Sequence, residues 1–199
     1  MNDTLTGLNV AILVTDGFEQ VEMTGPLQAL EQADATVKII GERSGQVQGK
    51  QHKQPGDRFD VRMTFAEADP MEFDAVLLPG GEENGYHIRE LADARQFVQQ
   101  MDEMGKPVAA ICHGPLLLAA AGLLQGRTMT SWPGIEDEMR SAGANWVDRE
   151  VVVDGNLITS RKPDDVPAFS RQLIEALQQR LQASIRGTRD EHPEIGPQG

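Results

Sequence analysis

The fold of this 199-residue chain is decided by the stretch Lys106-Pro107-Val108-Ala109-Ala110-Ile111-Cys112-His113-Gly114-Pro115. Val108 to Ile111 is a short apolar run between turn formers, a pattern that predicts a buried strand. Pro115 suits the first turn of a helix, where no N–H is needed, and the Leu/Ala run before Gly122 favours a helix. The sequence therefore predicts a sharp strand-to-helix turn at Cys112-His113-Gly114.

Cys112 is the only cysteine of the chain, and the predicted turn places it at a helix N-terminus. Unpaired amide hydrogens and the positive end of the helix macrodipole stabilise a thiolate there, so we expect a low thiol pKa and a nucleophilic sulfur. His113 can add charge stabilisation or act as a base, and the small Gly114 lets a substrate approach. The spacing Ala110-x-Cys112-x-Gly114 imitates the nucleophile elbow G-x-S-x-G. The alternative is that Cys112 is a small buried hydrophobe.

The composition is typical of a globular protein, with 39% hydrophobic and 25% charged residues. We expect one domain over residues 1–185 and a polar, disordered tail over 186–199. The net charge of −13 disfavours nucleic acid and anionic membranes as partners, and no apolar run approaches the roughly 20 residues of a membrane span. A single cysteine excludes an intrachain disulfide and the N-terminus lacks signal-peptide features, so we expect the cytoplasm. The four histidines show no metal-ligand spacing, so we expect no metal.

Predicted strands and helices alternate along most of the chain. Apolar runs at 8–15, 36–40 and 74–78 predict further strands, whereas 43–60 is polar and glycine-rich and predicts a hairpin or excursion. Predicted helices cover 27–32 (after Pro26), 88–105, 135–142 and a last segment with a stripe of Phe169, Leu173, Leu177 and Leu181. Asp154-Gly155 between β-branched flanks predicts a late β-hairpin. This order predicts an α/β sandwich with a mainly parallel sheet and helices on both faces.

Three candidate chemical elements follow predicted strands directly: Glu19, Gly80-Gly81 and Cys112-His113. In open α/β sheets, ligands bind outside the carboxyl ends of the strands, so the three could converge on one site. A Gly-Gly turn exposes backbone N–H groups that can form an oxyanion hole or hold a phosphate. The alternatives are a solvated helix-start carboxylate at Glu19 and an ordinary tight turn at Gly80-Gly81.

Several ordered motifs are similar to those of a known family. They are Asp16-Gly17-Phe18-Glu19-Gln20-Val21-Glu22, Leu78-Pro79-Gly80-Gly81, the stretch Gly105 to Pro115, Ser131-Trp132-Pro133-Gly134-Ile135, Trp146-Val147-Asp148, Val151 to Asn156 and Ser160 to Asp165. Over residues 8–181 the chain resembles the PfpI-like intracellular cysteine peptidases, a branch of the superfamily that includes the Parkinson-associated deglycase.

The resemblance implies a flavodoxin-like fold, a homo-oligomer of two or more subunits, and chemistry without a cofactor. It implies that Cys112 is the nucleophile and His113 its partner, and that Glu19 hydrogen-bonds the cysteine sulfur. Gly81 and His113 would supply oxyanion-hole amides, with Gly80 and Gly114 beside them. Family activities include peptide hydrolysis, removal of glyoxal adducts from proteins and conversion of methylglyoxal to lactate. Small carbonyl compounds or glycated proteins and peptides are therefore the expected substrates, and stress resistance the expected role.

The sequence departs from the family pattern after the Pro-Gly-Gly turn. PfpI-like proteins often place there an acid that orients the histidine across a subunit interface, whereas this chain has Tyr86, with Glu82 or Glu83 as possible substitutes. A triad without its orienting group loses the fixed tautomer and much of its rate. Two other interpretations are a non-enzymatic stress sensor or chaperone with an oxidisable Cys112, and a glutamine amidotransferase. The amidotransferase ranks last because the chain lacks the late His-x-Glu pair.

Overall fold

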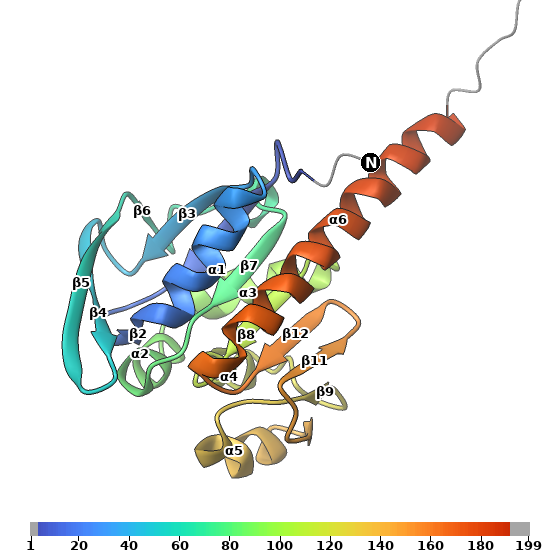
Figure 1. Ribbon diagram of the computed structural model, residues 1–199. Coiled ribbons are helices and arrows are strands. Elements are labelled where there is room, and N and C mark those ends of the chain that lie inside the picture. Colours follow the sequence, from blue (N-terminus) through green and yellow to red (C-terminus); the bar gives the residue numbers. More distant parts are fainter. Residues whose placement is uncertain (1–3, 192–199) are drawn as a thin grey trace, which may run out of the picture.

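A seven-stranded sheet forms the centre of the structure, a computed structural model that describes residues 4–191 (Figure 1). In spatial order its strands are β11 (Val151–Asp154), β12 (Leu157–Ser160), β8 (Val108–Ile111), β7 (Ala75–Leu78), β1 (Asn9–Leu13), β3 (Thr36–Gly41) and β6 (Met63–Thr64). Every neighbouring pair is parallel except β11 with β12, which form an antiparallel hairpin. The predicted α/β fold with a mainly parallel sheet and a late hairpin is confirmed.

Helices cover both faces of this sheet, as Figure 1 shows. On one face lie α1 (Gln20–Gln32) and α6 (Val166–Glu191), and on the other lie α2 (Glu82–Ile88), α3 (Ala92–Glu103), α4 (Pro115–Ala120) and α5 (Glu136–Ser141). Because both faces are covered, the central strands β7 and β8 are buried at every residue. This explains why their sequences are continuous apolar runs rather than alternating ones.

The boundaries of two predicted helices differ in the structure. Helix α1 begins at Gln20 and passes through Pro26, whereas the sequence predicted that Pro26 divides a short first turn from a helix over 27–32. A proline inside a helix removes a hydrogen bond and costs about 3 kcal/mol, which burial of the helix's apolar face offsets. The segment predicted as one helix over 88–105 is divided, because α2 ends at Ile88 and α3 begins at Ala92.

Helix α6 also extends further than the sequence predicted. It continues to Glu191, past the predicted domain boundary at residue 185. The predicted stripe of this helix is buried at Phe169, Leu173 and Leu177. Residues 192–199 of the predicted tail lie outside the described residues.

The polar segment after β3 forms the predicted hairpin. Strands β4 (Gly45–Gln51) and β5 (Gln54–Val61) pair antiparallel, and β2 (Phe18–Glu19) joins them in a small three-stranded sheet. At the hairpin tip, His52 has a φ of 56°. A second small sheet pairs β9 (Thr128–Met129) with β10 (Asn145–Trp146).

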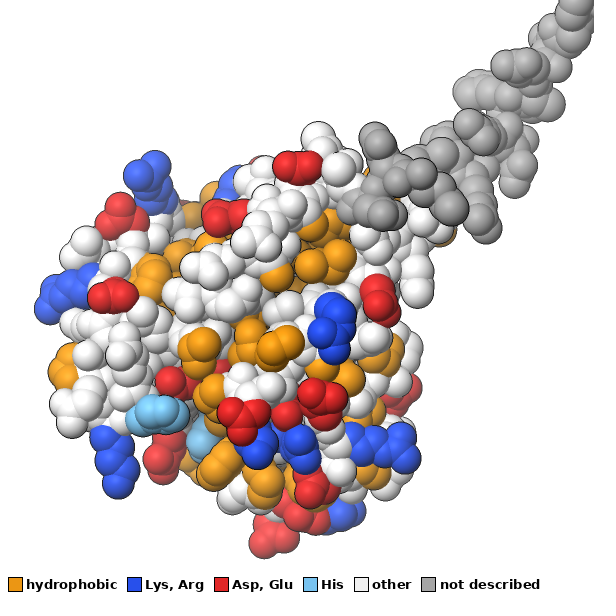
Figure 2. Space-filling view, in the orientation of Figure 1, with side chains coloured by type: hydrophobic (Ala, Val, Ile, Leu, Met, Phe, Trp, Pro, Cys, Tyr) orange, Lys and Arg blue, Asp and Glu red, His pale blue; other side chains and the backbone are white. Residues whose placement is uncertain are grey.

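The surface carries mixed charge on the face shown in Figure 2, where acidic and basic side chains are interspersed. Among residues 4–191, no helix combines the length and apolar character that crossing a bilayer requires. The carboxyl ends of β1, β7 and β8 meet at one edge of the sheet, since the three strands are parallel neighbours. The turns that follow them carry Gly80-Gly81 and Cys112-His113.

Candidate active site

Cys112 lies in the tight turn between β8 and α4, as the sequence predicted. Its φ of 61° is in the left-handed region, which is strained for a residue with a side chain. Two backbone hydrogen bonds hold this conformation. The Cys112 N–H donates to the Ser160 carbonyl at 3.0 Å, and the Trp132 N–H donates to the Cys112 carbonyl at 2.9 Å. Strand β12 and the segment after β9 therefore fix the turn from both sides.

The Cys112 sulfur faces a set of polar groups from three elements. His113 Nδ1 lies 3.3 Å from Sγ. The backbone N–H groups of Gly81 and His113 both face the sulfur, and both act to lower the pKa of the thiol. These two amides are also the pair that the family resemblance implied for an oxyanion hole.

The glycines around the sulfur are required by close backbone approach. Gly81 has a φ of 93°, and a Cβ on it would lie 2.4 Å from the Gly17 carbonyl oxygen. A Cβ on Gly80 would lie 2.6 Å from the Cys112 Cβ. On Gly114 it would lie 2.3 Å from the Leu78 carbonyl oxygen, so this glycine lets the turn pack on β7. Gly114 does not line the pocket beside the sulfur.

The carboxyl group beside the sulfur belongs to Glu22, so the predicted contact of Glu19 with the sulfur is wrong. Glu22 is fully buried in the first turn of α1, interacts with Cys112, and accepts a hydrogen bond from the Gly80 N–H at 2.9 Å. The Glu19 carboxylate instead accepts from the His52 N–H at 3.1 Å. Since α1 begins at Gln20, Glu19 precedes the helix and faces the hairpin tip, whereas Glu22 turns inward.

A signal for Glu22 was present in the sequence. The buried residues of α1 are Glu22, Met23, Pro26 and Leu30, which recur at helical spacing. An acid on the apolar stripe of a helix is rarely buried unless it has a partner or a function. The expectation that Pro26 divides this segment concealed the stripe, because the helix was then predicted to begin after Glu22.

Burial sets the protonation states at the sulfur. It raises the pKa of Glu22 to about 8, so this carboxyl carries a proton at neutral pH. Burial also raises the pKa of the Cys112 thiol, and ionisation of Glu22 raises it further, so the direction is opposite to the predicted low pKa. Cys112 is only 8% exposed, and loss of hydration outweighs the helix dipole and the two amides. Burial lowers the pKa of His113, whose imidazole is therefore neutral and able to accept a proton.

A pocket of about 180 Å³ opens onto the sulfur. It is lined by Glu19, Glu22, His52, Gly81, Glu82, Cys112, His113, Trp132 and Pro163. Glu19 is thus a pocket residue, although it does not contact the sulfur. A neighbouring hollow of about 410 Å³ shares Glu19, His52, Gly81 and Glu82 and adds Lys50, Lys53 and Tyr86 among others. The two together offer room for a substrate larger than a three-carbon carbonyl compound.

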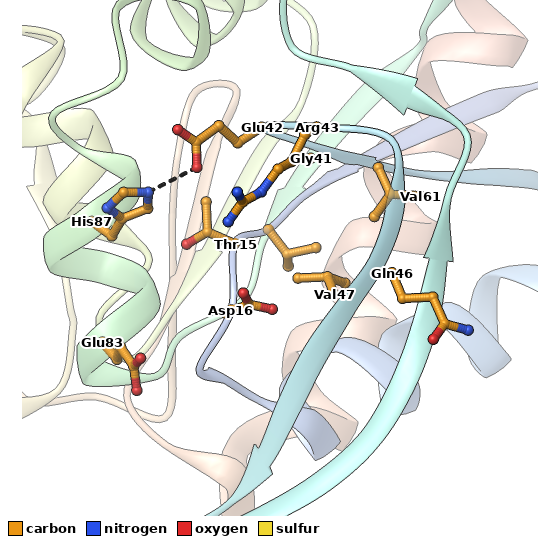
Figure 3. A pocket seen from close by; sticks show the side chains of 11 residues that line it. Thr15, Asp16, Gly41, Glu42, Arg43, Gln46, Val47, Val61, Glu83 and His87 are labelled. Atoms are coloured by element: carbon orange, nitrogen blue, oxygen red, sulfur yellow. Dashed lines mark hydrogen bonds and ion pairs between the residues drawn. The ribbon is translucent and has the colours of Figure 1, made fainter.

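Another hollow, of about 270 Å³, lies beside the ends of β1 and β3 (Figure 3). At its rim, His87 Nε2 lies 3.0 Å from Glu42 Oε2, and Glu83 pairs with Lys50 outside the hollow. It shares no lining residue with the Cys112 pocket, so it is not part of the candidate site. In the part of the chain that the structure describes, no three His, Cys, Asp or Glu side chains form a group that could hold a metal ion.

Comparison with known proteins gives one consistent result. The model of the DJ-1/PfpI family matches residues 8–176. A deglycase of Pyrococcus abyssi is 42% identical over 170 residues, covering 85% of this chain and 99% of its own. The deglycase PfpI of Pyrococcus furiosus is 41% identical with the same coverage. The name deglycase belongs in each case to the relative. The family resemblance inferred from the motifs is confirmed.

Solved structures agree with the fold. The DJ-1/ThiJ/PfpI-like and ferritin-like two-domain protein of Anabaena variabilis superposes with a TM-score of 0.81 at 38% identity, covering 86% of this chain and 48% of that one. DJ-1beta of Drosophila melanogaster superposes with a TM-score of 0.78 at 26% identity, covering 91% and 97%. The flavodoxin-like arrangement that the resemblance implied is therefore confirmed.

Proposed function

Because the chain belongs to the DJ-1/PfpI family, we propose that it is a deglycase-type enzyme in which Cys112 attacks reactive carbonyls or their adducts with proteins. One observation carries the proposal. The sulfur of Cys112 faces two backbone amides, a neutral imidazole and a protonated carboxyl group in one pocket. These groups supply a nucleophile, a base, an acid and an oxyanion site.

The first step is addition of the thiol to an aldehyde carbon. Since burial raises the pKa of Cys112, the resting group is a thiol that needs a base, and His113 Nδ1 at 3.3 Å accepts its proton. The sulfur–carbon bond forms as the carbonyl π bond breaks, and the proton passes to the new alkoxide to give a hemithioacetal. The Gly81 and His113 amides stabilise the alkoxide before it is protonated. With a carbinolamine adduct of a protein side chain, the carbon–nitrogen bond breaks as the sulfur–carbon bond forms, and His113 passes the thiol proton to the leaving amine.

The second step is an internal redox transfer, illustrated by methylglyoxal. The hydrogen on the former aldehyde carbon leaves as a proton and returns to the neighbouring ketone carbon through an enediol, carried by the His113 imidazole, which is neutral again after the first step. The aldehyde carbon becomes a thioester and the ketone becomes an alcohol, so one carbon is oxidised as its neighbour is reduced. Water then cleaves the lactoyl thioester, which releases lactate and restores the thiol. These two steps and the hydrolysis balance in atoms and electrons without an external oxidant or a cofactor.

The decisive experiment compares methylglyoxal turnover by the purified wild type and by Cys112→Ser. We expect Cys112→Ser to lose turnover while keeping its circular dichroism spectrum and its melting temperature. Glu103→Gln, at the exposed end of α3, is the matched control and should turn over like the wild type. Equal rates for the wild type and Cys112→Ser would refute the proposed chemistry. A glycated peptide, offered in parallel, tests whether protein adducts are better substrates than the free dicarbonyl.

Two alternatives are less well supported. Peptide hydrolysis needs a Cys-His-acid triad, and within one subunit no carboxylate of residues 4–191 hydrogen-bonds the His113 ring. An oxidative-stress sensor needs a reactive thiolate, and burial of Cys112 opposes it. Mass spectrometry after mild peroxide treatment distinguishes the sensor, because a sensor would convert Cys112 to sulfenic or sulfinic acid. The homo-oligomer and the cytoplasmic location stay predictions.

A further inference from the structure

The His113 imidazole lies between two aromatic rings. Trp132 stacks on one side, with ring centroids 6.4 Å apart and an interplanar angle of 26°. Tyr86, from α2, approaches from another direction at 6.4 Å and 56°. Aromatic neighbours at such distances restrict the rotation of a ring without supplying a charge. Tyr86, at the position where the family pattern places an acid, is therefore one of two aromatic residues that pack around His113.

Tyr86 is itself fixed by two charged groups. Its hydroxyl donates to Glu138 Oε1 at 2.6 Å, and Arg89 Nη1 donates to Glu138 Oε2 at 2.9 Å. The Arg89 guanidinium also lies over the Tyr86 ring, 4.6 Å from its centroid. The hydrogen bond to Glu138 raises the pKa of Tyr86, so the hydroxyl stays a protonated donor at neutral pH. Glu138 comes from α5, so the network joins α2 to α5.

Helix α2 is packed closely enough on His113 to transmit this constraint. A Cβ on Gly85 would lie 2.9 Å from the His113 Cβ and 2.9 Å from its carbonyl oxygen. The helix backbone therefore contacts the nucleophile turn beside Tyr86, and little space is left for His113 to move toward α2.

We propose that Glu138 is a positioning residue that holds the His113 imidazole against the Cys112 sulfur by fixing Tyr86. In this chain the Glu138–Tyr86 pair takes the place of an acid that would hydrogen-bond the imidazole directly. Glu138 does not line the Cys112 pocket, and its hydrogen bond reaches His113 through the ring of Tyr86. Its charge also acts on His113 through space and favours the protonated imidazole. The inference concerns the site of the proposed function and rests on it for its catalytic meaning. The geometry of Cys112 and His113 can be tested separately.

The test is the rate at which iodoacetamide alkylates Cys112, measured from about pH 6 to pH 9. Because Cys112 is the only cysteine, the rate reports this one thiol and does not require turnover. Tyr86→Phe keeps the ring and removes the hydroxyl, whereas Glu138→Ala removes the acceptor and Glu138→Gln keeps an acceptor oxygen. Glu136→Ala on the same helix is the matched control, since Glu136 pairs with Arg140 on the surface.

We expect Tyr86→Phe and Glu138→Ala to slow alkylation about fivefold near neutral pH, the effect of one lost hydrogen bond. Glu138→Gln and Glu136→Ala should stay within about twofold of the wild type. Unfolding cannot mimic this result, because Cys112 is 8% exposed and a loosened fold would speed its alkylation. The pH profile is compared among variants, since several ionisable groups face or surround His113: Glu19, Glu22, His52, Glu82, Cys112 and Glu138.

Two results would overturn the proposal. One is alkylation of Tyr86→Phe and Glu138→Ala at the rate of Glu136→Ala. The other is an equal loss in Glu138→Gln and Glu138→Ala, because the charge of Glu138 would then act without the hydrogen bond. If the wild type turns over methylglyoxal, kcat should fall about fivefold in Tyr86→Phe with KM unchanged. Absence of wild-type turnover would refute the proposed function, and the alkylation rates would still decide the role of Glu138.

Discussion

Replacing Glu22 by glutamine should remove a large part of the pH dependence of stability. Burial raises the pKa of Glu22 from 4.5 to about 8. A tenfold change in a protonation equilibrium corresponds to about 1.4 kcal/mol, so the protonated carboxyl favours the folded state by about 5 kcal/mol relative to the ionised one. Because the folded-state pKa is raised, this stabilisation is fully present below the unfolded-state pKa. It is lost as the pH rises through about 8.

The measurement is urea unfolding, followed by tryptophan fluorescence at several pH values from about 4.5 to 8.5. The free energy of unfolding of the wild type, taken relative to Glu22→Gln, should fall by about 4–5 kcal/mol across this range. Glutamine keeps an oxygen for the Gly80 N–H, so the variant isolates the ionisation. Glu103→Gln is the control, since Glu103 is exposed at the end of α3 and lies outside the Cys112 pocket. Wild-type and Glu22→Gln curves that run parallel would refute the reasoning.

Two further substitutions test the turn that faces the sulfur. Gly81→Ala should lose turnover and unfold at lower urea, because its φ is 93° and its Cβ would lie 2.4 Å from the Gly17 carbonyl oxygen, which is backbone and cannot move aside. Alkylation of Cys112 in this variant at the wild-type rate would contradict that expectation. Asn84→Ala should lower the free energy of unfolding by about 2–3 kcal/mol, because it removes several buried hydrogen bonds. Asn84 Oδ1 accepts from the buried Thr15 N–H at 2.7 Å, and Nδ2 donates to two carbonyls of the turn. A loss below about 1 kcal/mol in urea titration would count against it.

The elements that the sequence predicted well are those whose burial is uniform. Strand β8 reads as an apolar run because helices cover both of its faces, and the Asp154-Gly155 turn is specified by its own backbone requirements. The helix beginning at Gln20 was missed because tertiary packing offset the local cost of Pro26. Local propensity therefore fails where burial elsewhere on the helix decides the outcome.

The sequence predicted the turn that carries Cys112 correctly, but it did not predict which carboxyl group lies beside the sulfur. Glu19 and Glu22 are one helical turn apart, and which of them faces the sulfur depends on where α1 begins. The thiol pKa was predicted in the wrong direction, because a helix N-terminus can be recognised in a sequence whereas loss of hydration cannot. The contact of Tyr86 with Glu138 spans 52 positions in the chain and follows no local pattern.

The sequence by itself determined the alternation of strands and helices, the strand-to-helix turn that carries Cys112, and the family, because each depends on residue types at fixed local spacing. Only the tertiary structure decided which groups surround the sulfur and which of them carry protons. Glu22, Gly81 and His113 come from different elements, and they meet because parallel strands end at the same edge of the sheet. Their protonation follows from the water that this convergence excludes, a property of the packed molecule rather than of any segment.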